Sequence, residues 1–204
     1  GTGTLNANKF LADVRGGPLL NVDESKPYGF TADVQAGATH AVLKGDITHP
    51  FHLDPFDADV RLSGVDLADL YYLTGLALPG TPPYRIRGRL TRNGAFYSLH
   101  HLFGQVGASD LQGELTVNVA GTKPLLRGSL NSRVLDFDDL GALFGGGSHA
   151  VQSAGLLPDA PLHTERLRQM DADGSFAADS IRSRDFPLRG LVTHIVLRDG
   201  VLTL

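Results

Sequence analysis

Residues 111–119 read LQGELTVNV, in which apolar residues or glycine alternate with polar residues at every position. Successive side chains of a β-strand point to opposite faces, so a period of two predicts a strand with one apolar face and one solvated face. Residues 126–131 read LRGSLN and repeat the pattern. The same alternation is found in five other stretches, which begin at Phe30, Leu43, Phe56, Tyr84 and Leu191.

Short turn signals separate these stretches, at Gly37-Ala38, Asn93-Gly94, Gly121-Thr122 and Asp199-Gly200. Such glycine-containing dipeptides favour the tight turns of β-hairpins. The predicted fold class is therefore mainly β: a curled, groove-like antiparallel sheet that repeats one β unit and carries two or three short helices. Glycines at positions expected on the apolar face give the sheet room to curve, namely Gly45, Gly88, Gly113 and Gly128.

Two short helical segments interrupt the strands and form an internal repeat. Residues 65–75 (VDLADLYYLTG) align with residues 135–145 (LDFDDLGALFG), with aspartate, leucine and the closing glycine at matching places. Composition then divides the chain into a sheet region at residues 1–145, a flexible linker or loop rich in Gly, Ser and Pro at residues 146–163, and the start of a further β repeat at residues 164–204. Because the chain stops within a predicted hairpin, we expect it to be a fragment.

Composition excludes several classes of protein. With 204 residues, 42% of them hydrophobic and 20% charged, the chain can bury a substantial core and is not a disordered acidic tail. A formal net charge of −4 argues against a nucleic-acid surface, which usually needs a basic excess. The sequence has no cysteine, which excludes disulfides and thiol catalysis, and no run approaches the ~18 apolar residues of a membrane span.

Aspartates at the two helix starts are candidates for acid–base chemistry or cation binding. Asp66 with Asp69, and Asp136 with Asp139, stand three residues apart, which on a helix places both on one face. Aspartate is also a preferred N-cap, and a second acid in the first turn meets the positive end of the helix dipole. We therefore predict that these aspartates cap the two helices rather than catalyse a reaction.

The histidines give a weaker signal. His49, His52 and Asp54 offer three metal ligands in six residues, but without a fourth ligand nearby they make a poor zinc site. His100 and His101 are adjacent on a predicted strand and should point to opposite faces. The sequence contains no nucleophile elbow and no phosphate-binding loop motif. We therefore predict no catalytic residues, no metal and no cofactor.

Arginines form the most notable charge feature of the sequence. Arg85, Arg87 and Arg89 share one face of a predicted strand, with Arg92 close behind. They could bind lipid phosphates or an acidic partner through paired hydrogen bonds. The alternative, which the polar-out alternation favours, is a solvated outer face of the sheet.

Several turn-and-strand motifs resemble the AsmA family of bacterial envelope proteins. They are the run from Phe103 to Val117, the run from Lys123 to Ser132, and the helix start at residues 135–140. The runs at residues 161–173 and 197–204 look like the next repeat of that family, so the resemblance covers most of the chain, from near Phe30 onward. These motifs specify a β scaffold and contain no active site.

The resemblance implies a location and a function. AsmA-like proteins are attached to the inner membrane by an N-terminal helix, extend into the periplasm, and are implicated in outer-membrane lipid homeostasis. They are similar to bridge-like lipid-transfer proteins, whose sheet curls into an apolar groove. We therefore expect a non-enzymatic periplasmic segment that is involved in phospholipid transport and envelope biogenesis and is tethered by a helix outside this sequence. Its expected partners are phospholipid acyl chains, with an envelope protein as a second candidate partner and no nucleic acid.

An apolar sheet face must be covered by the curl of the sheet, by a helix or by a ligand. We predict that acyl chains contact this face at twelve positions: Leu43, Ile47, Val60, Leu62, Ile86, Leu90, Leu115, Val117, Leu126, Leu130, Ile195 and Leu197. The alternative is a structural or interaction module, in which the sheet closes on a solid core. Its exposed edge would then assist outer-membrane protein assembly by adding a strand to a partner.

Overall fold

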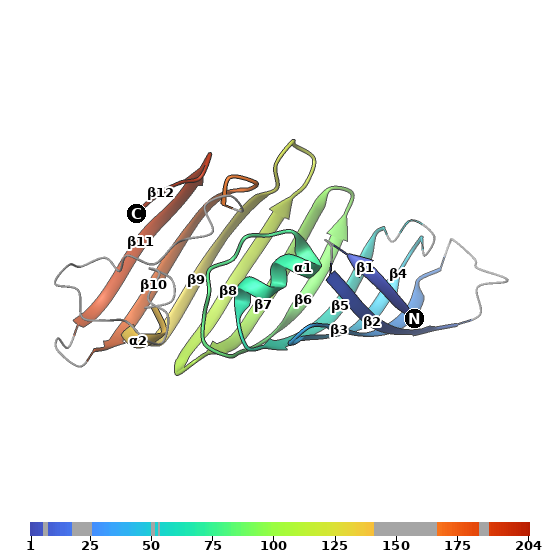
Figure 1. The fold of residues 1–204 in the computed structure, drawn as a ribbon, viewed down its shortest axis with the longest axis horizontal. Coiled ribbons are helices and arrows are strands. Elements are labelled where there is room, and N and C mark those ends of the chain that lie inside the picture. The colour runs from blue at the N-terminus through green and yellow to red at the C-terminus, as the bar shows by residue number, and fades with distance from the viewer. Residues whose placement is uncertain (6–7, 18–25, 50–51, 53, 141–166, 184–187) are drawn as a thin grey trace.

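One open sheet of twelve strands forms most of the protein (Figure 1). The computed structural model describes residues 1–5, 8–17, 26–49, 52, 54–140, 167–183 and 188–204. The strands follow one another across the sheet in chain order, which confirms the mainly β fold class. Their bounds are β1 (Thr2–Leu5), β2 (Asn8–Gly16), β3 (Tyr28–Ala36), β4 (Thr39–Ile47), β5 (Phe56–Gly64), β6 (Tyr84–Asn93), β7 (Phe96–Val106), β8 (Ser109–Asn118), β9 (Leu125–Asp136), β10 (Asp171–Arg182), β11 (Leu188–Arg198) and β12 (Val201–Thr203).

One strand pair departs from the predicted antiparallel arrangement. β9 and β10 are parallel, with Leu125 opposite Asp171 and Asp136 opposite Arg182, whereas the other ten neighbouring pairs are antiparallel. A parallel pair requires a long connection that returns the chain to the edge from which it started. The predicted linker at residues 146–163 falls within this connection and lies outside the described residues.

The segment between β5 and β6 contacts the end of the connection between β9 and β10. We call residues 65–83 the β5–β6 insertion. Within it, the Tyr71 hydroxyl donates a hydrogen bond to Oε1 of Gln169 at 2.8 Å. The amide nitrogen of Ala77 lies 3.1 Å from Sδ of Met170, which is buried. The two longest connections of the sheet therefore meet on the same side of it.

Aspartates cap the short helices, as the sequence predicted. The 3-10 helix η2 (Leu67–Leu70) begins after Asp66, whose Oδ1 accepts a hydrogen bond from the amide of Ala68 at 2.9 Å. It continues as α1 (Tyr71–Thr74). The helix α2 (Phe137–Leu140) follows Asp136, whose Oδ1 accepts from the amide of Asp138 at 3.0 Å. The sequence allowed a third short helix at residues 164–169, of which residues 164–166 lie outside the described residues.

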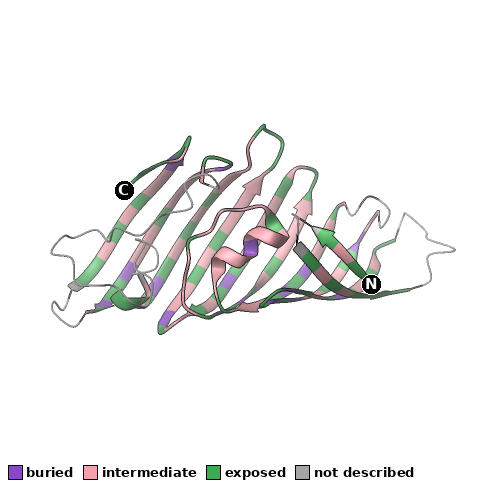
Figure 2. Ribbon diagram, viewed as in Figure 1, coloured by how far each residue is buried: buried purple, intermediate pink, exposed green. Residues whose placement is uncertain are grey.

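The register places the apolar residues of successive strands on one common face. Leu43 of β4 lies opposite Val60 of β5, and Leu62 of β5 lies opposite Ile86 of β6. Residues directly opposite one another in a sheet point to the same side. We call this side the apolar face and the other side the polar face. Along the strands, bands of more and less exposed residues alternate accordingly (Figure 2).

The sheet curls toward the apolar face. β1 and β2 lie on the same side of the sheet as α1, in front of β3 to β5 (Figure 1). The β5–β6 insertion covers the middle of this face, where Leu70 forms a buried cluster with Tyr84, Ile86 and Leu102. The result is a curved sheet with one hydrophobic cluster under the insertion and a second one between β9 and β10, formed by Leu135, Ala178 and Ile181.

A bulge in β7 interrupts the alternation there. The pairing with β8 shifts register between Leu99 and Leu102, and His101 at this point has a φ of 50°. Leu99 and Leu102 both contact the cluster under the insertion, while His100 lies opposite Arg89 on the polar face. The extra residue lets two leucines three positions apart share one face, which a strict period of two does not anticipate.

Candidate functional site

The apolar face is the candidate site, and the register places all twelve predicted contact residues on it. The pairings connect these residues from β4 to β11 without a change of side. For example, Leu90 lies opposite Leu99, which lies opposite Leu115 in the next strand. Likewise, Val117 lies opposite Leu126. Contact of these residues with acyl chains stays a prediction.

The β5–β6 insertion covers the central part of the apolar face. Leu67, Leu70 and Leu78 of the insertion pack into the same cluster as residues of β5 to β9. Four of the twelve predicted contact residues belong to this cluster or pack against it: Leu62, Ile86, Leu115 and Leu130. In this part of the face, side chains of the protein itself cover the predicted lining.

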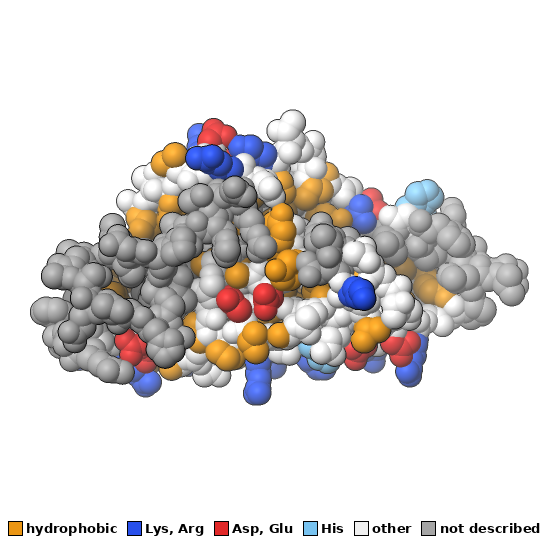
Figure 3. Space-filling view, viewed as in Figure 1, with side chains coloured by type: hydrophobic (Ala, Val, Ile, Leu, Met, Phe, Trp, Pro, Cys, Tyr) orange, Lys and Arg blue, Asp and Glu red, His pale blue; other side chains and the backbone are white. Residues whose placement is uncertain are grey.

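The curled part of the apolar face, from β2 to β5, is unevenly covered. Val14 of β2 points to this side through its pairing with Ala32 and is 65% exposed. The rings of Phe30 and Phe56 meet edge to face with centroids 6.4 Å apart, and both residues are only partly buried. Where Figure 3 shows this side of the molecule, hydrophobic side chains gather near its centre together with two acidic ones, and most other charged side chains lie along the outline. Hydrocarbon surface is therefore accessible at Val14 and in part at Phe30 and Phe56, whereas Ile47 and Val60 in the same part of the face are buried, at 5% and 3% exposure.

Charged residues are nearly excluded from the apolar face. Along β3 to β8, whose residues are all described, the register leaves one charged residue on this side, Arg92 at the end of β6. Its guanidinium lies 5.1 Å from the ring centre of Tyr97. Arg92 therefore does not share a face with the other three arginines of β6.

The apolar face also holds one buried pair of hydroxyl groups. The hydroxyl of Tyr84 lies 3.4 Å from that of Thr39, and burial raises the pKa of Tyr84.

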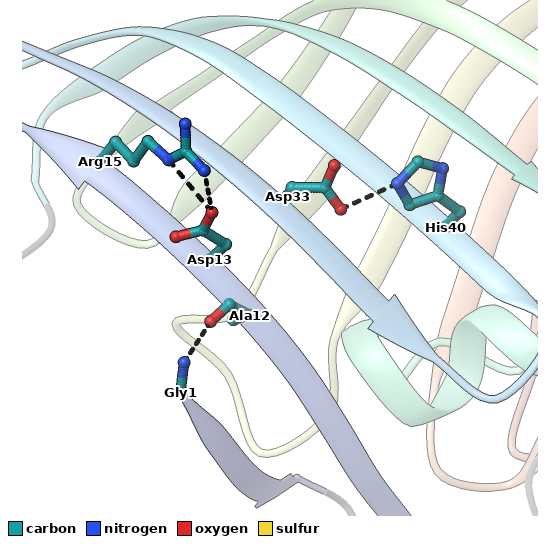
Figure 4. Close-up of polar contacts among 6 residues, drawn as sticks. All are labelled: Gly1, Ala12, Asp13, Arg15, Asp33 and His40. Atoms are coloured by element: carbon teal, nitrogen blue, oxygen red, sulfur yellow. Dashed lines mark hydrogen bonds and ion pairs between the residues drawn. The ribbon is translucent and has the colours of Figure 1, made fainter.

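The polar face holds charged groups in exposed pairs. Near the curled end, Arg15 pairs with Asp13 at 2.7 Å and His40 pairs with Asp33 at 2.9 Å (Figure 4). Exposed pairs of this kind contribute little to stability because water screens them. Their arrangement agrees with the solvated outer face that the alternation predicted.

Asp110 of β8 is held more firmly by the neighbouring strand. Partial burial opposes its ionisation, but hydrogen bonds from the amide of Val134 at 2.7 Å and from Nε of Arg133 at 3.0 Å outweigh that effect and lower its pKa. The Ser132 hydroxyl adds a longer contact at 3.3 Å. Asp110 is therefore engaged in joining β8 to β9.

Asp139 has a role that the sequence did not reveal. Its Oδ2 accepts hydrogen bonds from the amides of Ala108 and Ser109, each at 2.9 Å, and from the Ser109 hydroxyl at 2.6 Å. The Ser109 hydroxyl in turn accepts from the amide of Asp136 at 2.9 Å. Asp139 thus ties α2 to the β7–β8 turn, whereas we predicted only a favourable place in the helix dipole. No local pattern signals a partner thirty residues away.

The histidine-rich loop does not form a metal centre among the described residues. His49 donates from Nδ1 to the carbonyl oxygen of Asp54 at 2.9 Å. The Asp54 carboxylate accepts from the amide of Gly94 at 2.9 Å, and His52 is exposed. These groups hold the loop before β5 against the β6–β7 turn. Among helices in the described part of the chain, none is long and apolar enough to cross a membrane.

Comparison with known proteins places this geometry in a family. The sequence profile of the AsmA family matches residues 1–204. The chain is 32% identical over 212 residues to the AsmA family protein YhjG of Escherichia coli K12, a match that covers 93% of this chain and 31% of that protein. The chain therefore spans about a third of the length of this curated relative. No solved structure matches it.

Proposed function

The chain belongs to the AsmA family, and from this membership and the apolar face we propose that it takes part in phospholipid transport. AsmA-type proteins are envelope-associated and generally non-enzymatic. In this proposal the segment lies in the periplasm, is tethered to the inner membrane by a helix outside this sequence, and contacts acyl chains through its apolar face. The observation that carries the proposal is the extent of that face, on which β3 to β8 present Arg92 as their one charged residue.

Burial of hydrocarbon supplies enough free energy to hold a lipid on such a face. Each methylene transferred from water to apolar surroundings gains ~0.8 kcal/mol. About ten methylenes therefore gain roughly 8 kcal/mol before the entropy cost of binding is subtracted. Since this gain needs no specific polar contact, a chain can shift from one strand to the next without breaking a strong bond. A surface of this kind suits movement better than tight storage.

The insertion divides the apolar face into parts that differ in access. Ile47 and Val60 lie in the curl but are buried, at 5% and 3% exposure, whereas Leu43 between them is only partly buried and lies outside the cluster under the insertion. Leu62, by contrast, packs against the cluster under the insertion. We therefore expect lipid contact in the curl at Leu43, and weaker contact at the buried Ile47 and Val60 and under the insertion.

Photo-crosslinking at adjacent positions of one strand tests the proposal with matched controls. A crosslinking amino acid is placed at Leu43, Val117 or Leu126, and separately at their polar-face neighbours Lys44, Thr116 and Arg127. After illumination in cells, phospholipid adducts are measured by mass spectrometry. We expect adducts at the apolar-face positions and few at the neighbours, because adjacent strand residues point to opposite sides.

Two outcomes would contradict lipid contact on the apolar face. Adducts confined to Thr116, Arg127 and Asn131 would place the lipid on the polar face. Adducts that are equally frequent on both faces would show contact with lipid in general rather than with this surface. Crosslinking at Leu130 under the insertion serves as a further control, and its yield should be lower than that at Leu43.

A second candidate function rests on the outer strand β12. Its residues are exposed, with Val201 at 65% and Leu202 at 47%, and the sheet does not close on β1. In this candidate function, a partner strand adds to this edge and the protein assists outer-membrane protein assembly. Replacing Leu202 by proline removes one backbone donor. Loss of outer-membrane protein assembly in this variant, with lipid crosslinking at Leu43 unchanged, would favour the second candidate.

A further inference from the structure

An open hollow of about 580 Å³ lies on the sheet between β4 and β8. Three arginines of the polar face line it, Arg61 of β5 and Arg85 and Arg87 of β6. Arg61 lies directly opposite Arg87, and Arg85 is two residues farther along the same side of β6. Like charges directly opposite one another destabilise a sheet. The arrangement is therefore unfavourable unless an anion compensates it.

In the part of the chain that the structure describes, no carboxylate forms an ion pair with these three arginines. The contrast with Arg89, next along the same face of β6, is sharp. Arg89 binds Asp57 through Nε at 2.6 Å and Asp59 through Nη1 at 3.3 Å. Arg89 is thus paired with two aspartates, whereas Arg85 and Arg87 on the same strand line the hollow without an ion pair to a described carboxylate.

The other ionisable groups that line the hollow are engaged elsewhere. His40 is hydrogen-bonded to Asp33 at 2.9 Å. Asp110 is the one carboxylate among the described lining residues, and it is paired with Arg133 at 3.0 Å and accepts from the amide of Val134. The Asp110 carboxylate is therefore already bonded to β9. The three arginines contribute most of the remaining charge that lines the hollow.

The apolar lining gives the hollow a second property. The guanidinium of Arg87 lies 5.1 Å from the ring centre of Phe103, which is 42% exposed. Val42 of β4 lies opposite Arg61 and lines the hollow as well. Cationic groups beside an exposed ring and a valine fit a ligand that has an anionic head and an organic body.

We infer that Arg61, Arg85 and Arg87 form a binding site for the phosphate group of a phosphate ester. A guanidinium presents a planar fork of donors that matches two phosphate oxygens and stays charged at all physiological pH values. A bound phosphate would also relieve the repulsion across the β5–β6 pair. The hollow is of the size usual for small-molecule sites. Its ligand is either the headgroup of an anionic phospholipid or a soluble phosphate ester.

This site lies on the opposite side of the sheet from the surface proposed to contact acyl chains. Its loss would leave the apolar face and the transport proposal as they are. The site therefore adds an anion-binding function to the polar face and is tested separately.

The test compares two triple variants that lose the same charge. R61Q/R85Q/R87Q removes the three arginines of the hollow, and R127Q/R189Q/R198Q removes three exposed arginines outside it. Glycerol 1-phosphate and inorganic phosphate are titrated into each protein, and binding is followed by the NMR signals of the arginine Nε–Hε groups. Flotation with vesicles of phosphatidylcholine, with or without phosphatidylglycerol, measures binding to the headgroup.

We expect the unaltered chain and the control variant to bind alike. The affinity of R61Q/R85Q/R87Q should be lower by roughly tenfold for each arginine that contacts the phosphate. Binding to phosphatidylglycerol vesicles alone would identify a lipid headgroup as the ligand, and binding to the soluble ester would identify a soluble source. An equal loss of binding in both triple variants, or no binding of any probe to the unaltered chain, would overturn the proposal.

A third variant separates charge from geometry. R61K/R85K/R87K keeps every positive charge but lacks the guanidinium forks. We expect it to fold and to bind the probes more weakly than the unaltered chain does. Unaltered affinity in this variant would show that charge alone attracts the anion and that no arginine site exists.

Discussion

Replacing Asp139 by alanine should loosen the tie between α2 and the β7–β8 turn. The carboxylate accepts hydrogen bonds from the amides of Ala108 and Ser109 and from the Ser109 hydroxyl. Ser109 is 5% exposed, so its amide would lose its acceptor without gaining water, at a cost of about 1–3 kcal/mol. Ala108 is exposed and its amide can bond to water instead. The lost hydroxyl contact costs about 0.5–1.5 kcal/mol more. We therefore expect the free energy of unfolding to fall by roughly 2–4 kcal/mol.

Urea unfolding and amide hydrogen exchange measure this effect globally and locally. Asp139→Ala should lower the unfolding midpoint and speed exchange at Ala108 and Ser109. Asp139→Asn keeps one acceptor oxygen and should lose less stability. Asp46→Ala is the matched control, because Asp46 is exposed on the polar face and has no hydrogen bond or ion pair in the described part of the chain. Its unfolding free energy should stay within about 0.5 kcal/mol of that of the unaltered chain.

The reasoning fails if Asp139→Ala and Asp46→Ala behave alike. In that case the three short contacts would not contribute to stability, and water would replace the carboxylate without cost. Unchanged exchange of the Ser109 amide in Asp139→Ala would lead to the same conclusion even if the whole chain became less stable.

Three further predictions concern stability. A side chain at Gly45 would collide with the backbone of β5, so Gly45→Ala should cost about 1–3 kcal/mol in urea unfolding, whereas Gly29→Ala, which meets only a carboxylate oxygen at 3.6 Å, should change little. Leu70→Ala should cost about 2–5 kcal/mol and speed hydrogen exchange throughout the β5–β6 insertion; unchanged exchange there would contradict the role of Leu70 in the core. The pKa of Asp110 is lowered on folding, so the stability it contributes is present above its unfolded pKa of about 3.9 and is lost as the pH falls through the folded value. The difference in unfolding free energy between the unaltered chain and Asp110→Asn should therefore shrink as the pH falls below about 4, and a difference independent of pH would refute this linkage.

The alternation of apolar and polar residues predicted the strands and their common face, because polar residues face water and apolar residues face the other side of the sheet. Leu115 and Val117 stand on the same side as Leu126 and Leu130 of the next strand, as the pattern required. A shift of register by one residue would have moved a whole strand to the wrong side. This is why the twelve predicted contact residues stay together across most of the sheet.

The remaining features depend on contacts between distant residues. The parallel pairing of β9 with β10 leaves the period of two unchanged, so alternation does not distinguish it from an antiparallel pair. β1 and β2 join the sheet beside β3, but Leu11 interrupts the alternation of Phe10, Ala12 and Val14, and the sequence did not settle whether these residues belong to it. The hydrogen bonds that Asp139 makes to the β7–β8 turn form only when α2 packs against that turn. Likewise, the residues under the β5–β6 insertion become buried only when the insertion packs on the sheet.

The strands lie in the sheet in the same order as in the sequence, which has a consequence for how a longer chain of this kind would be built. Each strand hydrogen-bonds to its predecessor and its successor, so lengthening the chain would extend the sheet at its edge without rebuilding what came before. A substitution that disturbs one strand would then mainly affect that strand and its two neighbours, and the rest of the sheet would keep its structure. A protein built in this way could span a greater distance by adding strands alone, and each added strand would continue the same apolar face.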